Sequence, residues 1–202
     1  MTIWRERHPL ILASQSAVRR SLLANAGIAV ETVPAHIDER GIPQNSGLTA
    51  PGKIAALLAG EKAKLISRQN PDRYVVGADQ TLALGDRLFS KPDNRAAAAV
   101  QISLLAGQTH ELHSAVSVAK DGVPLFSDVS VARMTMRPLT DGEIAAYVDE
   151  AGDAVTTSVG AYQLEKTGVH LFERIDGDHF TILGLPLLPL LGFLRSRNLL
   201  AV

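Results

Sequence analysis

The spacing of apolar residues changes along the chain, and the changes predict where strands and helices lie. Residues 9–13 form a continuous apolar run that is typical of a buried strand. Residues 14–16 then supply hydroxyl side chains that can cap a helix over residues 17–26, and Gly27 closes that helix. The chain is therefore predicted to begin with a strand, a tight turn and a helix.

The next part of the chain predicts a second strand and a long amphipathic helix. Residues 28–33 form the candidate strand, and the polar, turn-rich stretch 34–46 is expected to be a loop. Thr49 and Pro51 start the helix, in which Lys62 lies on the apolar stripe. The stripe repeats at helical spacing through Ile54, Leu57, Leu58, Leu65 and Ile66.

The remaining elements alternate between strands and helices. In chain order the pattern predicts strand 74–84 with a hairpin to 88–89, helix 94–105 capped by Asp93, paired strands 109–119 and 125–136, helix 144–150, strands 171–175 and 180–183, and helix 187–197. Because helices alternate with hairpins, we expect the α/β class with a mixed sheet and flanking helices. No repeat or linker divides the chain, so residues 1–202 are expected to form one domain.

Composition excludes several classes of function. The 202 residues are 46% apolar and 20% charged, which is typical of a folded globular protein. The net charge is −1 without a basic block, so we expect no nucleic acid polymer as a partner. The chain has no cysteine, which excludes disulfides and thiolate chemistry.

Neither end of the chain resembles a targeting or membrane segment. The charged residues 5–8 precede an apolar run that is too short for a secretory signal. The most apolar stretch, residues 182–194, is short and is broken by glycine and proline, so we interpret it as buried rather than membrane-spanning. A cytoplasmic location is expected. The hairpin over residues 109–136 is either core or a homodimer face.

The turn that leads into the first helix is a candidate anion site. Ser14 and Ser16 offer hydroxyl donors beside the positive end of the helix dipole, and Arg19 follows one turn later. A guanidinium can fork two phosphate oxygens. The alternative is an ordinary serine cap followed by solvated arginines.

Two charged residues on apolar elements are further candidates. Lys62 either extends its ammonium to water or meets an anion, because an unpaired buried ammonium costs several kcal/mol. Asp79 ends the buried run 74–78, with Lys91 beyond the next hairpin. A carboxylate there can hold a metal or take a proton from water, or it can simply satisfy nearby main-chain donors.

The carboxylates Asp38 and Glu39 lie in the loop 34–46 and are the hard oxygen ligands that Mg²⁺ and Mn²⁺ prefer. His110 and His113 are three residues apart on a predicted strand, which places them on opposite faces and excludes a helical zinc motif.

These motifs, in this order, resemble the Maf family of nucleoside triphosphate pyrophosphatases over nearly the whole chain. The amino-terminal signature corresponds to residues 12–20, the acidic pair to residues 38–39 and the lysine helix to residues 61–64. The later motifs of the family correspond to residues 77–79, Lys91-Pro92, Ala106-Gly107, His110, 160–162, 175–177 and 184–186. The resemblance implies an elongated, two-lobed fold, like that of inosine triphosphate pyrophosphatases, with a nucleotide cleft between the lobes.

The resemblance also implies an activity: hydrolysis of a nucleoside triphosphate between its α and β phosphorus atoms, which removes non-standard nucleotides. A divalent cation such as Mg²⁺, Mn²⁺ or Co²⁺ is implied as cofactor. Asp79 would act as general base or metal-bound activator of water, and Glu39 with Asp38 would hold the cation. The phosphates would be bound by Ser14, Arg19, Lys62 and Lys91.

Three positions bear on the base of the substrate. Gln80 and Glu165 resemble the branch of the family that prefers 7-methyl-GTP, whereas Val18 stands where that branch usually has tryptophan, which could stack on a methylated guanine. The 7-methyl-GTP branch is favoured. The alternatives are a dTTP/UTP pyrophosphatase of the same family and a non-catalytic, nucleotide-binding regulator of cell division.

Overall fold

The computed structural model describes residues 3–202 of the chain, which group into two compact units. The first unit contains the described residues up to Gln80 together with Ser114–Ser130 and Leu183–Val202. The second contains Thr81–His113 and Val131–Ile182. The strands β3 (Val75–Leu84), β5 (Thr109–Lys120) and β6 (Val123–Met136) contribute residues to both units.

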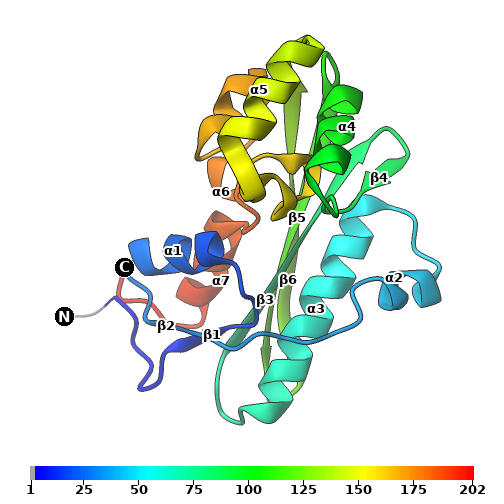
Figure 1. Cartoon of the computed structure of the whole chain (residues 1–202). Helices are drawn as coiled ribbons and strands as arrows, with labels where there is room; N and C mark the ends of the chain where they lie inside the picture. Colours follow the sequence, from blue (N-terminus) through cyan, green and yellow to red (C-terminus); the bar gives the residue numbers. More distant parts are fainter. Residues whose placement is uncertain (1–2) are drawn as a thin grey trace. The chain divides into compact units, whose positions relative to one another are not determined.

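The first unit is a sheet with helices on both faces (Figure 1). Its strands follow the order β2-β1-β3-β5-β6, and β1 (Leu10–Leu12) pairs in parallel with β2 (Val30–Thr32) and with β3. In Figure 1, α3 (Pro51–Gln69) lies on one side of the strands, and α1 (Ala17–Asn25) and α7 (Leu187–Ser196) lie on the other.

Small residues bring α3 close to the sheet. Ala55 and Ala59 of α3 pack against Ala115 of β5 in one buried cluster. Gly77 of β3 lies so near the helix that a Cβ there would collide with the main chain of Ala59 and of Ala63. The helix is therefore held tightly against β3, the strand that carries Asp79.

The second unit has its own apolar core. Its strands follow the order β4-β3-β5-β6-β7, in which β4 (Arg87–Phe89) and β7 (Phe172–Asp176) form antiparallel pairs. The helices α4 (Arg95–Leu105) and α5 (Asp141–Ala151) pack together beside them (Figure 1). The core joins α4, α5 and the strands through Ile102, Leu105, Leu112, Met134, Met136 and Ile144.

The α/β class with a mixed sheet is confirmed, since parallel and antiparallel pairs occur together. The assignment of one domain and the central cleft stay predictions. Among residues 3–202, no helix is both long and apolar enough to cross a membrane.

Some predicted elements were wrong in kind or in extent. The predicted strand 180–183 is instead α6 (His179–Ile182), because Asp178 accepts hydrogen bonds from the main-chain N–H and the hydroxyl of Thr181 and so starts a helical turn. The predicted loop 34–46 ends in a short helix, α2 (Gly41–Ser46). The cap of α4 is Asn94 rather than Asp93.

Candidate active site

Lys62 joins two carboxylates in the first unit. Its Nζ lies 2.7 Å from Oδ1 of Asp79 and 2.6 Å from Oε1 of Glu39. Lys62 and Asp79 are buried, with 7% and 8% of their surface exposed, whereas 57% of the Glu39 side chain is exposed. Of the two alternatives for Lys62, the encounter with an anion is correct, and its ammonium does not extend freely into water.

Local structure explains this meeting. Lys62 lies on the buried stripe of α3, one turn from Leu58 and from Ile66, so its side chain faces the sheet. Asp79 follows the buried residues 75–78 of β3. Because Gly77 lets α3 approach β3, the ammonium reaches the carboxylate directly.

Burial makes Asp79 a stronger base than an exposed aspartate. Desolvation raises the pKa of Asp79 above its usual value, and the charge of Glu39 acts in the same direction. The charges of Lys62 and Arg19, together with the hydrogen bond from Lys62, act in the opposite direction without cancelling the effect. Raised carboxyl pKa values of this kind are found where proteins perform proton transfer.

Arg19 is tied to the main chain around the cluster. Its Nε donates to the carbonyl of Gly184 at 2.7 Å, and its Nη1 donates to the carbonyl of Ala78 at 2.8 Å. Burial lowers the pKa of Arg19, while the charges of Asp79 and Glu39 oppose that effect. Arg19 is therefore not a solvated side chain, whereas Arg20 is exposed, as the alternative of solvated arginines predicted. The sequence marks Gly184 only as part of the motif 184–186, and nothing in its local pattern indicates Arg19 as its partner.

The turn before α1 supplies hydroxyl groups beside Arg19. Ser16 is the N-cap of α1 and accepts from the main-chain N–H of Arg19, as predicted. The hydroxyl of Ser14 accepts from Nη1 of Arg19 at 3.4 Å and from the N–H of Ser16 at 3.2 Å. Ser14 and Arg19 thus belong to one local network at the start of the helix.

Asp38 and Glu39 are adjacent in the sequence, but their side chains contact different partners. Oδ1 of Asp38 accepts from the main-chain N–H groups of Arg40 and Gly41, at 3.2 and 2.8 Å, and so supports the start of α2. Glu39 extends to Lys62. The assignment of both residues to a cation stays a prediction, and the geometry favours Glu39.

The other predicted site residues are spread over both units. Gln80 donates from Nε2 to the hydroxyl of Ser114 on β5 at 2.9 Å, and Val18 is half-buried in α1. Lys91 and Glu165 belong to the second unit and are exposed. Ser114 lies within an ordinary strand pattern, and no local signal marks it as the partner of Gln80.

The donor set fits a cation that is completed by substrate oxygens. Glu39 and Asp79 present oxygen atoms to a single ammonium, and Mg²⁺ commonly needs only one or two carboxylates when phosphate supplies further ligands. No group of three or more histidine, aspartate or glutamate residues suited to a metal ion occurs within residues 3–202. His110 is buried, and its Nε2 forms a 2.7 Å hydrogen bond with the hydroxyl of Tyr162.

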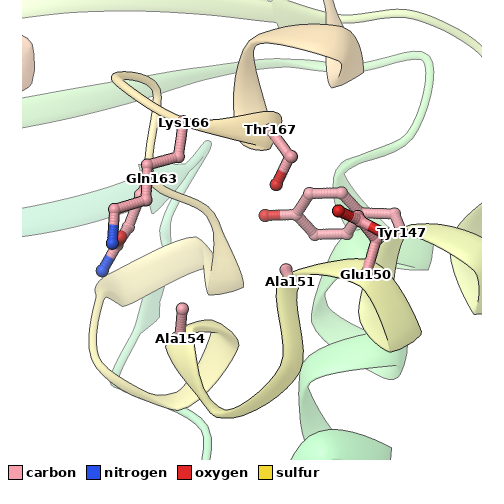
Figure 2. Close-up of a pocket in the computed structure, with 7 residues that line it drawn as sticks. All are labelled: Tyr147, Glu150, Ala151, Ala154, Gln163, Lys166 and Thr167. Carbon is pink, nitrogen blue, oxygen red and sulfur yellow. The ribbon is translucent and has the colours of Figure 1, made fainter.

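The second unit contains a pocket of about 170 Å³ that the sequence did not predict (Figure 2). Figure 2 shows Tyr147 and Thr167 in the lining, and the hydroxyl of Tyr147 donates to the carbonyl of Ala161 at 3.2 Å. Oε1 of Gln163, also in the lining, is buried and lacks a hydrogen-bond partner within the described chain. The other lining residues are Glu150, Ala151, Ala154 and Lys166.

Comparison with known proteins identifies the family. Residues 9–197 match the family model described as Maf-like protein. The chain belongs to the Maf family. It is 66% identical to a nucleoside triphosphate pyrophosphatase of Rhodopseudomonas palustris, over all of both chains. It is 51% identical to a 7-methyl-GTP pyrophosphatase of Brucella abortus, over 94% of this chain and 96% of that one.

Among solved structures, a HAM1 protein from Coxiella burnetii is similar over 63% of this chain and 72% of that one, with 15% identity and a TM-score of 0.42. A likeness of that size adds nothing to the family assignment.

Proposed function

We propose that this chain is a nucleoside triphosphate pyrophosphatase that releases a nucleoside monophosphate and pyrophosphate. The observation that carries the proposal is the buried ammonium of Lys62 between Asp79 and Glu39. The names of its full-length relatives agree with this reaction. A hydrolase for polyphosphates needs a base for water and positive charge for the phosphates, and both occur in this cluster.

Asp79 is proposed to receive a proton from the attacking water. The water oxygen forms a bond to the α phosphorus, the bond from that phosphorus to the bridging oxygen breaks, and pyrophosphate leaves. The raised pKa of Asp79 supports this role, because a stronger base accepts the proton more readily. A bound divalent cation would neutralise charge on the phosphates, and Glu39, with Asp79 or Asp38, would hold it.

Lys62, Arg19 and Ser14 are proposed to bind the phosphates. Two of the three guanidinium nitrogens of Arg19 donate to main-chain carbonyls or to Ser14, so Arg19 acts as a fixed positive charge that also holds the turn in place. Lys91 is proposed for the same task on the basis of the family resemblance alone.

For the nucleobase of the substrate, we propose a preference for 7-methyl-GTP. The support is Gln80 and Glu165 in the family pattern, together with a 51% identical relative that carries that name. Val18 lacks the aromatic ring that could stack on the methylated base. A preference for dTTP or UTP is the alternative outcome of the experiment below.

The experiment compares wild type with Asp79→Asn, using Mg²⁺ and a panel of 7-methyl-GTP, GTP, dTTP, UTP and CTP, with products identified by chromatography. We expect monophosphate and pyrophosphate from wild type and a loss of about 10²-fold or more in Asp79→Asn. Asp86→Asn, which makes the same change at an exposed hairpin position, should retain activity. Full activity in Asp79→Asn would refute the mechanism. Absence of turnover by wild type under several cations would favour a binding regulator.

A further inference from the structure

The ammonium of Lys62 occupies the position between two carboxylates that a bound cation would also favour. The oxygen atoms of Asp79 and Glu39 lie 2.7 and 2.6 Å from the same nitrogen. A divalent cation held by both carboxylates would carry its charge within a few ångströms of that ammonium. Two cations that close repel strongly where burial lowers the effective dielectric constant.

We propose that Lys62 and the divalent cation are alternative partners of the same two carboxylates. The cation on its own then binds weakly, because it must displace a buried ion pair. A bound nucleoside triphosphate removes the competition between Lys62 and the cation. Its phosphates attract the ammonium of Lys62, and Asp79 and Glu39 are then available to the cation. This inference rests on the proposed function and adds an order to it: the cation binds strongly only together with the nucleotide.

Burial strengthens the competition between Lys62 and the cation for the two carboxylates. Lys62 is 7% exposed, so its charge near Asp79 is poorly screened by water. Lys64 offers a matched comparison on the same helix. It pairs with Glu61 at 2.8 Å, but both of these side chains are about one-third exposed, and neither belongs to the cluster. Removal of the Lys64 charge alters the net charge of the protein by the same amount as removal of the Lys62 charge.

The test measures the binding of Mn²⁺ alone, through the electron paramagnetic resonance signal of the free ion. It uses wild type, Lys62→Met and Lys64→Met in the same buffer at the same pH. We expect Lys62→Met to bind Mn²⁺ about tenfold or more tightly than wild type, and Lys64→Met to match wild type. The double variant Lys62→Met with Asp79→Asn should lose the gain. Equal or weaker binding by folded Lys62→Met would overturn the inference.

A second measurement uses only the wild-type protein and so does not depend on the folding of a variant. Each lysine is acylated with an amine-reactive reagent, with and without saturating Mn²⁺, and the modified peptides are quantified by mass spectrometry. Mn²⁺ that displaces the ammonium should raise the reactivity of Lys62 several-fold and leave Lys64 unchanged. Unchanged reactivity of Lys62 would overturn the inference.

Failure of this inference is distinguishable from failure of the proposed function. If wild type hydrolyses nucleotides while Lys62→Met gains no affinity for Mn²⁺, only the competition is wrong. If wild type hydrolyses none of the nucleotides while the Mn²⁺ comparison gives the expected gain, the competition holds and the reaction is wrong.

Discussion

Arg19 donates a 2.8 Å hydrogen bond to the main-chain carbonyl of Ala78, the residue that immediately precedes Asp79. The same guanidinium binds the carbonyl of Gly184, so one side chain of α1 holds two distant segments of the first unit. The position of the proposed base thus depends on an arginine that lies 60 positions earlier in the chain.

Replacement of Arg19 by lysine should therefore affect both stability and activity. A lysine ammonium keeps the charge but cannot reproduce the planar fork that donates to Ala78 and Gly184. We expect a loss of about 1–3 kcal/mol in the free energy of unfolding, measured with urea, because carbonyls lose their donors. We also expect kcat/KM to fall about tenfold or more. Arg20→Lys, at the exposed neighbouring position, should change neither quantity.

The pH profile of kcat/KM should report the ionisation of Asp79. Since the base must be ionised and burial raises its pKa, activity should decline toward acid pH in a range above the ordinary aspartate value of about 3.9. Lys62 opposes that rise, so the remaining activity of Lys62→Met should decline at a still higher pH. A profile that is flat down to the ordinary carboxyl range would contradict the role of Asp79.

Two glycines provide a paired test of how closely α3 approaches the sheet. Gly77→Ala should destabilise the protein by about 1–3 kcal/mol, because the new methyl group would collide with the main chain of α3. Gly60→Ala, within α3, has open space around the new Cβ and should stabilise the protein by about 0.5–1 kcal/mol through better helix propensity. Urea unfolding measures both, and similar effects from the two changes would contradict the close approach.

His110 should make stability depend on pH. Burial lowers its pKa to about 4 in the folded protein, from 6.5 when it is exposed. As the pH falls, this histidine therefore gains a proton in the unfolded chain before it does so in the folded protein. Its contribution to the free energy of unfolding is fully present above about pH 6.5 and is lost progressively toward about pH 4. Between pH 7 and pH 5 the loss from this group is about 2 kcal/mol.

The check on His110 is thermal or urea unfolding of wild type and His110→Gln across this pH range. The variant should lose the part of the pH dependence that belongs to the buried imidazole. His113→Gln, which changes a half-buried histidine on the same strand, should retain it. Identical pH dependence in wild type and His110→Gln would contradict the assignment.

Local patterns in the sequence predicted much of the fold. Apolar runs located β1 and β3, helical periodicity located α3, and the serine cap located the start of α1. These features depend on residues within one or two turns of each other. Two elements differ from the prediction: α2 lies in a stretch that was expected to be a loop, and α6 forms where the apolar residues 180–183 favoured a strand. The hydrogen bonds from Thr181 to Asp178 made the segment helical instead.

The sequence by itself determined which groups were available for chemistry: a lysine on an apolar stripe, an aspartate at a buried strand, an acidic pair in a loop and an arginine after a capping turn. Only the tertiary structure decided their partners. It joined Lys62 to Asp79 and to Glu39, turned Asp38 toward the main chain of α2, and tied Arg19 to Gly184. The physical reason is that periodicity reports burial, whereas the partner of a buried charge depends on which distant segment packs against it.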